Sequence, residues 1–387
     1  MLKNKILKIF NILLILFSFL DIKIYGNYKN PDEQTKQELL SKINAGIPKW
    51  MTNQINADLA NAPKYAITNS MLDQILDQDP LFFAKFSIKN GQISFYTKPD
   101  MPRRHDCLPL LWILEELNNY IKLPDVDFLY NVDDAPYCYE SLIVNLVPPT
   151  SKARYLCPVL ASTKHINDIN VIPIPDYHTF RDFEEFTKEI VLGNAKYPWK
   201  TKKAKAFWRG STTGGIYYPA NYHIFPRVKL VQLSKKYPDI LDAKFNKIVQ
   251  DGGNIQSIFT NLDYIGNTIN ISDHIQYKYQ ILIDGNSAAW TRCWWQLHSN
   301  SVILKQNSNY LQWYHELLKP YVHYIPFDYF CSDLIEKIQW AQDNDKKAQE
   351  IVKNANLIAE HCLQYSDLLL YIYAVITSYA KLLTFEP

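Results

Sequence analysis

Three segments of the sequence combine small or hydroxyl residues with arginine, a combination suited to binding an anion. The first is 207–213, Phe-Trp-Arg-Gly-Ser-Thr-Thr, in which Ser211 follows a run of strand-forming residues. The second is Pro226-Arg227, where proline favours the first position of a helix and so places Arg227 in its first turn. The third is 284–292, Asp-Gly-Asn-Ser-Ala-Ala-Trp-Thr-Arg, which ends in Arg292.

Each of these segments also has an ordinary structural explanation. Ser211 fits a plain Gly-Ser turn, and Arg227 fits a solvated surface arginine. A cation in a first helical turn opposes the helix dipole, however, and an anion between Arg227 and the helix end would relieve that opposition. Backbone N–H groups together with a guanidinium can hold a phosphate. Because the segments follow successive predicted strands, together they predict one shared diphosphate pocket.

A pair of carboxylates, Asp133-Asp134, ends a predicted strand at 126–132. A carboxylate at such a position can take a proton from an acceptor hydroxyl. A turn or helix cap is the structural alternative, and the residues alone favour it. Two loose D-x-D patterns, at 125–127 and 343–345, resemble those of metal-dependent sugar transferases. The first enters a strand and capping explains the second, so we expect no metal site.

The elements that must position these residues alternate between strand and helix after residue 204. Such alternation predicts a parallel sheet whose ligands lie where strands lead into helices. The expected strands are 205–208, 279–283, 302–305 and 323–326, and the expected helices are 226–236, 288–298, 311–318 and 333–341. Before these elements we expect a hairpin within 82–96 and a helix at 106–122. After them we expect two further helices between 346 and 383.

Length and composition narrow the possible functions. The 387 residues suggest two domains, at roughly 100–200 residues each, and a net charge of +2 argues against a dedicated nucleic-acid binder. With only 11 glycines, Gly-rich nucleotide motifs are disfavoured. The six cysteines are irregularly spaced and are expected to be mostly free.

The N-terminus has the pattern of a targeting segment. Lys3, Lys5 and Lys8 precede an apolar run over 9–20, which predicts a signal peptide or signal anchor within residues 1–26. An amphipathic core helix is the alternative. A targeting segment implies a protein of the secretory pathway or one that associates with a membrane through this segment, with the cytoplasmic face as the alternative location.

Four segments together resemble glycosyltransferase family 90. They are 207–211, Tyr-Lys-Tyr at 277–279, the segment 284–292, and Leu-Lys-Pro-Tyr-Val-His-Tyr-Ile-Pro at 318–326. The resemblance runs from about residue 123 to residue 383. The family contains protein O-glucosyltransferases, fungal capsule-associated xylosyltransferases and bacterial lipopolysaccharide-modifying homologues.

The resemblance implies an α/β, GT-B-like fold: two Rossmann-like domains that face a central cleft, with C-terminal helices. It implies an acceptor-side domain at 27–198 that carries the catalytic base, and a nucleotide-sugar-binding domain at 199–387 with closing helices. The implied reaction is an inverting, metal-independent transfer of glucose or xylose from a UDP-sugar to a hydroxyl of a protein or surface glycan. No cofactor is required.

The resemblance also assigns residues to this reaction. Asp134 matches the family's catalytic carboxylate, which overrides the capping explanation. The positions that match the nucleotide-diphosphate contacts are Ser211, Arg227, Ser287, Ala288, Ala289, Trp290, Thr291 and Arg292. Animal relatives have paired cysteines around the Tyr-Lys-Tyr strand, whereas Ile275 stands at one of those places here. The resemblance also implies that acceptor specificity lies largely in the first domain, whose N-terminal 100 residues match no known pattern, so an acceptor of the EGF-repeat kind is not supported.

Two other functions compete with this interpretation. One is a non-catalytic glycan- or nucleotide-binding descendant of the same fold. The other is a phosphoryl-transfer enzyme that uses the same anion pocket, although the sequence contains no metal-phosphate motif.

Overall fold

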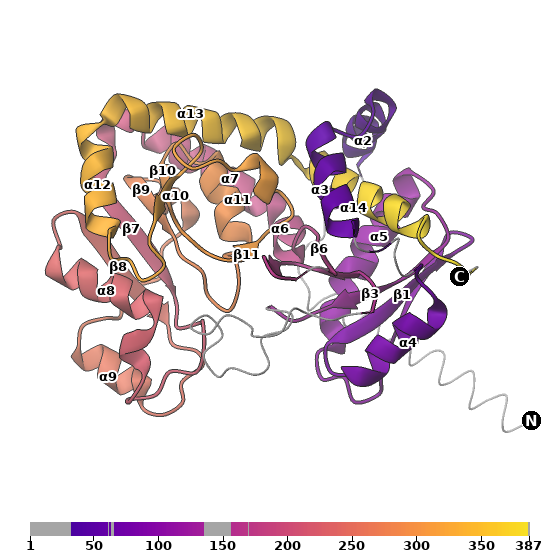
Figure 1. Cartoon of the computed structure of the whole chain (residues 1–387). Coiled ribbons are helices and arrows are strands. Elements are labelled where there is room, and N and C mark those ends of the chain that lie inside the picture. Colours follow the sequence, from indigo (N-terminus) through magenta and orange to yellow (C-terminus); the bar gives the residue numbers. More distant parts are fainter. Residues whose placement is uncertain (1–31, 61, 63–65, 135–155, 169, 386–387) are drawn as a thin grey trace, which may run out of the picture.

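The computed structural model describes residues 32–385 apart from 61, 63–65, 135–155 and 169. It is a mixed α/β structure with two five-stranded sheets, which lie in separate lobes (Figure 1). The predicted targeting segment at 1–26 and Cys138 lie outside the described residues. The five described cysteines are free, as predicted. Within the described part of the chain, no helix has the length and apolar character needed to cross a membrane.

The first sheet has the strand order β2-β1-β3-β4-β6. Its strands are β1 (Phe83–Lys89), β2 (Gln92–Thr97), β3 (Val126–Asn131), β4 (Val159–Ala161) and β6 (Val171–Pro173). The predicted hairpin is present: β1 and β2 are antiparallel and are joined by Asn90 and Gly91, both with positive φ. β1 is also antiparallel to β3, whereas β3, β4 and β6 are parallel. The first sheet therefore differs from an all-parallel Rossmann sheet.

The second sheet is parallel throughout, as predicted. Its strands are β7 (Lys203–Ser211), β8 (Leu241–Lys247), β9 (Tyr277–Leu282), β10 (Val302–Gln306) and β12 (Ile325–Phe327). Across the sheet they lie in the order β12-β10-β9-β7-β8. Thus β7, which comes first of these five strands in the sequence, lies inside the sheet. The direction of chain progress reverses between β7 and β9. Ligands of such sheets bind at this switch point, outside the carboxyl ends of the strands.

Helices cover both faces of the second sheet, and the inner strands β9 and β10 are accordingly buried at most of their positions. Ile281 and Ile283 pack in a core shared with α8 (Pro226–Lys236), α12 (Leu334–Asp343) and α13 (Asp345–Cys362). Leu282, which points to the opposite face, packs in the other core with residues of α11 (Thr291–His298). Successive side chains along this strand therefore point to opposite faces of the sheet and pack against different helices.

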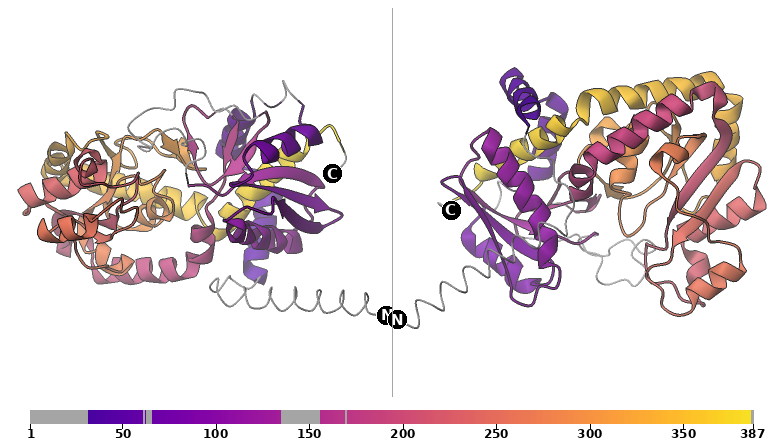
Figure 2. Two further views of the ribbon diagram at one scale, coloured as in Figure 1. Left: turned by 90° about the horizontal axis from the view of Figure 1, so that it is seen from below. Right: turned by 180° about the vertical axis from the view of Figure 1, so that it is seen from behind.

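The last helix, α14 (Tyr365–Ala380), lies against the first sheet, although it comes after the whole second sheet in sequence (Figures 1 and 2). It packs on α2 (Glu33–Ala45), α3 (Lys49–Leu59), α5 (Leu108–Tyr120) and β3. Conversely, α7 (Phe183–Lys196) packs on α10 (Ile271–His274) and α11. The division of the chain between residues 198 and 199 stays a prediction. Each of the two halves contributes one helix that packs on elements of the other half.

The remaining elements are short or peripheral. They are α4 (Asn69–Gln78), η2 (Arg104–Cys107), β5 (Lys164–His165), α6 (Tyr177–Arg181), η3 (Trp199–Thr201), η4 (Tyr222–Ile224), α9 (Ile255–Asn261), β11 (Tyr310–Leu311) and η5 (His315–Leu317).

Two predicted helices need correction. The helix expected at 311–318 is wrong: β11 pairs with β5, and only η5 is helical. The backbone carbonyl of the buried Trp313 accepts a hydrogen bond from Gln54 Nε2, a contact with a residue far away in the sequence where a helix would have a local bond. The helix expected at 288–298 begins only at Thr291, because Trp290 has φ 41° and ψ −127°, which no α-helix accommodates.

Candidate functional site

A pocket of about 320 Å³ opens at the switch point of the second sheet. It is lined by residues that follow strands of both sheets: Asp134, Tyr177, His178, Gly210, Ser211, Thr213, Arg227, Gly285, Asn286, Ser287, Ala288, Ala289, Trp290 and Arg292. Every predicted site residue except Thr291 is among them. Thr291 instead donates its hydroxyl to Asp176 Oδ1 at 3.0 Å, a contact that joins α11 to the N-terminus of α6.

Arg227 is a buried residue of this pocket, and not a solvated surface arginine. Its Nη1 donates to the Ser211 carbonyl at 2.7 Å, its Nε to the Asp284 carbonyl at 2.8 Å and its Nη2 to the Ile283 carbonyl at 3.3 Å. These bonds tie the end of β7 to the end of β9. Burial lowers the pKa of Arg227, but the group keeps its charge at neutral pH.

Glycine is required next to this guanidinium. A Cβ on Gly285 would lie 2.8 Å from Arg227 Nη2 and 2.4 Å from Thr213 Oγ1. The close approach of the 284–292 segment to Arg227 therefore depends on a residue without a side chain.

Arg292 brings a second positive charge to the same pocket. Its Nη2 donates to the Arg209 carbonyl at 2.7 Å. Burial, and then the neighbouring Arg227 cation, lower the pKa of Arg292 to about 10. The two guanidinium cations repel each other, and an anion bound between them would attract both and so offset that repulsion.

The backbone between these arginines is strained at Trp290. A non-glycine residue with φ 41° is uncommon, and such residues cluster at ligand sites. The conformation is held at both ends of the residue: the indole Nε1 donates to Ser287 Oγ at 3.1 Å, and the backbone carbonyl accepts from Gln312 Nε2 at 3.0 Å. The segment is thus fixed before any ligand binds.

Asp134 reaches the pocket from the first sheet, because it follows β3. Asn286 Nδ2 donates to Asp134 Oδ2 at 3.1 Å. The Oδ1 atom of Asn286 accepts from Gly214 N at 2.9 Å and from Gln250 Nε2 at 3.0 Å. One amide thus connects the loops after β3, β7, β8 and β9. Residue types alone did not single out Asn286, because its role depends on contacts between distant loops.

The two neighbouring aspartates have different surroundings. Asp133 Oδ1 accepts from Asp134 N at 2.9 Å, so Asp133 takes the turn role that the sequence left open for the pair. The Asp134 side chain is 38% exposed, which leaves it accessible to a substrate, and Arg103 Nη2 lies 3.9 Å from its Oδ1. Arg103 also donates from Nε to Asp106 Oδ2 at 2.6 Å, which holds its guanidinium beside the carboxylates.

Aromatic rings that the sequence analysis missed line one side of the pocket. The rings of Tyr177 and His178 are stacked with centroids 4.1 Å apart, and His178 lies 5.7 Å from the Trp290 ring. Burial lowers the pKa of His178 and raises the pKa of Tyr177 to about 12, so both are neutral at neutral pH. The signal that could have found them is their place shortly after β6, at the carboxyl end of a parallel strand.

The D-x-D carboxylates have structural partners. Asp125 Oδ1 accepts from Asn90 N at 2.8 Å and so closes the hairpin turn. Asp127 is buried in β3, with its Oδ2 at 3.7 Å from Lys85 Nζ. Asp345 accepts from Lys278 Nζ at 2.9 Å and from Trp199 Nε1 at 3.1 Å. Among the described residues, no group of three or more His, Cys, Asp or Glu side chains is arranged to hold a metal ion.

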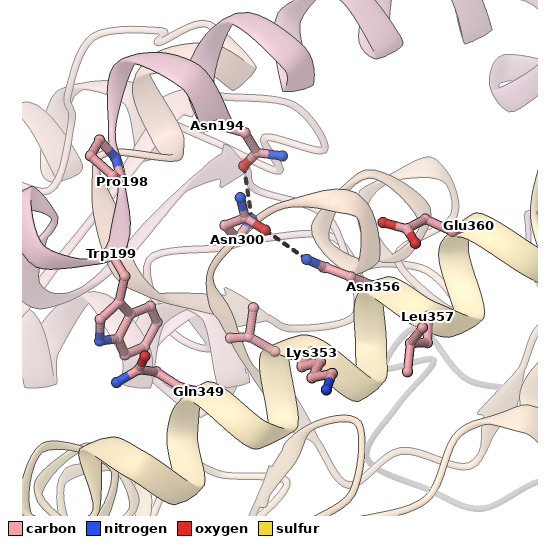
Figure 3. A pocket seen from close by; sticks show the side chains of 10 residues that line it. Asn194, Pro198, Trp199, Asn300, Gln349, Lys353, Asn356, Leu357 and Glu360 are labelled. Carbon is pink, nitrogen blue, oxygen red and sulfur yellow. Dashed lines mark hydrogen bonds between the residues drawn. The ribbon is translucent and has the colours of Figure 1, made fainter.

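A larger pocket, about 520 Å³, lies elsewhere, between the end of α7 and α13 (Figure 3). The predicted site residues, all of which the structure describes, do not line it. Its amide side chains bond to neighbouring chain segments: Asn194 Oδ1 accepts from Asn300 N at 2.8 Å, and Asn194 Nδ2 donates to the His298 carbonyl at 3.0 Å. These amides join α7 to the turn before β10, so we assign them a structural role.

Comparison with known proteins identifies the same family that the sequence motifs resemble. A family model described as glycosyl transferase family 90 matches residues 47–387. The chain is 29% identical over 287 residues to protein O-glucosyltransferase 3 of Homo sapiens, covering 71% of this chain and 50% of that protein. It is 31% identical over 285 residues to the Mus musculus protein of that name, covering 71% and 51%.

A third relative is covered more fully. The chain is 27% identical over 313 residues to protein O-glucosyltransferase 1 of Homo sapiens, covering 75% of this chain and 72% of that protein. By contrast, the chain spans about half the length of the protein O-glucosyltransferase 3 relatives that it matches.

Proposed function

The chain belongs to glycosyltransferase family 90, and from this membership we propose that it transfers a sugar from a UDP-sugar to a hydroxyl group of a protein or surface glycan. Glucose is the first candidate sugar, because the similar proteins are named O-glucosyltransferases, and xylose is the second. The observation that carries the proposal is the pocket at the switch point, which Asp134 from the loop after β3 lines together with Arg227 of α8 and Arg292 of α11.

The proposed reaction is a single displacement. Asp134 takes the proton of the acceptor hydroxyl while that oxygen attacks the anomeric carbon. The bond between the anomeric carbon and the diphosphate oxygen breaks, and its electron pair leaves with UDP. Attack from the side opposite the diphosphate inverts the configuration of the sugar.

The departing UDP needs stabilisation of its negative charge. Arg227 and Arg292 supply two fixed positive charges, and both are held in place by bonds to backbone carbonyls before the ligand arrives. Ser211 and the backbone of 287–292 lie beside them and supply hydrogen-bond donors. Charges that are preorganised in this way need no rearrangement during the reaction. The proposal therefore includes no metal ion and no cofactor.

The arrangement of the two sheets suits this chemistry. We include in the proposal a GT-B-like division into two Rossmann-like domains, with the base on the first and the donor site on the second. The contact from Asn286 to Asp134 supports it, because it links base and donor loop directly. Residues 1–26 are proposed to direct the protein to the secretory pathway or to a membrane.

The acceptor is proposed without a commitment to EGF repeats. Ile275, which replaces one of the paired cysteines of animal relatives, is fully buried in the core. The described cysteines are free, so no disulfide braces the β9 region in the described residues.

A donor screen by thermal shift tests the proposal. Because a ligand that binds only the native state stabilises it by about 2.7 kcal/mol at a concentration of 100 times Kd, UDP-glucose or UDP-xylose should raise the Tm. GDP-sugars serve as the matched control. A Tm unchanged by every UDP-sugar would count against the proposal.

Turnover then separates the competing functions. Release of UDP in the presence of EDTA is expected for the proposed enzyme. A non-catalytic descendant would bind the donor without releasing UDP, and abolition of activity by EDTA would favour phosphoryl transfer.

A further inference from the structure

A second pocket, of about 280 Å³, lies at the carboxyl ends of β9 and β10. We call it the Lys305 pocket; Asp284, Lys305, Asn309, Tyr310, Tyr314 and Tyr324 are among its lining residues. It shares Ala288 and Ala289 with the diphosphate pocket, so the two cavities adjoin along the 284–292 segment.

The Lys305 pocket presents both a hydrogen-bond acceptor and a hydrogen-bond donor that carry charge. The half-buried Asp284 carboxylate accepts from the Ser308 hydroxyl, and withdrawal from water raises its pKa. Lys305, also half-buried, lies with its ammonium group 5.6 Å from the centroid of the Tyr324 ring. The Asp284 carboxylate would repel an anionic ligand, and an apolar ligand would cover both charged groups without offering either of them a hydrogen bond.

Three tyrosines belong to the remaining wall. Tyr310 and Tyr314 are buried, and the Tyr314 hydroxyl donates to Gln312 Oε1 at 3.3 Å. Tyr324 is half-buried and belongs to the 318–326 segment, which has no place in the diphosphate pocket. Such a wall combines flat apolar faces with hydroxyl tips.

These features together define the ligand chemistry. A pyranose ring has an apolar face of C–H groups that fits an aromatic wall, and hydroxyl groups that both donate to Asp284 and accept from Lys305. The volume of about 280 Å³ lies just below the usual range for ligand pockets, about 300–1,000 Å³, which suits one ring and not a longer chain.

We propose that the Lys305 pocket is a subsite for a single pyranose ring with free hydroxyl groups. The inference rests on the proposed function for the source of the ring. The ring is either the sugar of the donor, whose diphosphate lies across Ala288 and Ala289, or a sugar unit of a glycan acceptor.

Calorimetric titration of the full chain tests the subsite. The probes are UDP, UDP-glucose and methyl β-glucoside, each titrated into wild type, Lys305→Met and Tyr324→Phe. Tyr324→Phe keeps the ring and removes only a hydroxyl, so it reports on the pocket should Lys305→Met not fold. Lys347→Met, an exposed lysine on α13, is the matched control.

The expected result is an affinity loss of tenfold or more for a sugar-bearing probe in Lys305→Met, a smaller loss in Tyr324→Phe, and unchanged affinity for UDP. Loss confined to UDP-glucose identifies the donor sugar as the ring. Loss confined to methyl β-glucoside identifies an acceptor sugar.

Other outcomes separate this inference from the proposed function. Equal affinity of wild type and both variants for all three probes overturns the subsite and leaves the proposed function standing. A wild type that binds methyl β-glucoside through the pocket but neither UDP nor UDP-glucose supports the subsite and contradicts the proposed function. A wild type that binds none of the three overturns both.

Discussion

Asn286 donates a hydrogen bond from its amide nitrogen to Asp134 Oδ2 at 3.1 Å, and this bond joins the loop after β9 to the loop after β3. The orientation of the amide is fixed by its other end, because the backbone N–H of Gly214 can only donate and therefore faces Asn286 Oδ1. The amide thus holds Oδ2 of the proposed base, whereas Oδ1 lies 3.9 Å from Arg103 Nη2.

Replacement of Asn286 should reduce turnover without removing the donor site. Loss of a hydrogen bond to a charged group costs about 1.5–3 kcal/mol, so Asn286→Ala should lower kcat for UDP release by about 10- to 150-fold. Asn286→Asp should be worse, because it places a second carboxylate beside Asp134. The measurement is kcat together with Kd for UDP. Wild-type kcat in Asn286→Asp would contradict the positioning role.

Arg292 should contribute to binding of the diphosphate and not of the nucleoside. Arg292→Ala removes a charged, preorganised donor, so we expect the Kd for UDP to rise by about 10- to 100-fold. Arg292→Lys keeps the charge and should lose less. Uridine is the control ligand, and calorimetry gives both affinities. Equal weakening of uridine and UDP would show that the variant damages the fold or the nucleoside contacts instead.

Local sequence patterns predicted much of the second sheet but less of the site. Helix α8 begins at Pro226 and ends at Lys236, as expected, because proline sets its first turn and its apolar stripe packs on the sheet. The helix expected at 311–318 does not form, because β11 pairs with β5 from the other half of the chain. No local pattern carries that information.

The residues of the candidate site were likewise predictable only in part. That most of the predicted residues line one cavity could be foreseen, since most of them lie where strands end and strand ends meet at one edge of a parallel sheet. Asn286, Tyr177 and His178 gain their roles from contacts between loops that are distant in sequence. Their identification required the three-dimensional arrangement.

Lys202 should make stability depend on pH. It is buried, its Nζ donates to the Ile275 carbonyl at 2.6 Å and to Ser301 Oγ at 3.0 Å, and burial lowers its pKa to about 7. Between pH 7 and the ordinary lysine pKa, the unfolded chain binds one proton more than the native chain. The free energy of unfolding therefore rises with pH in this window.

The comparison with Lys202→Met isolates this effect, because all other titrating groups are shared. The stability of wild type relative to Lys202→Met should rise from pH 7 to pH 9, approaching about 1.4 kcal/mol per pH unit. Urea unfolding at several pH values measures it. A stability difference that does not vary with pH would show that Lys202 is charged in the native protein.

The most direct test of the central claim is the rate of UDP release from UDP-glucose by wild type and by Asp134→Asn, measured with a suitable acceptor and with UDP affinity determined in parallel. Asn keeps the shape of the side chain and its neighbours but cannot take a proton. If Asp134 is the general base, Asp134→Asn should lower kcat by about 10²- to 10⁴-fold while the Kd for UDP stays the same. Unchanged UDP release in Asp134→Asn would contradict the assignment of the base and, with it, the proposed mechanism.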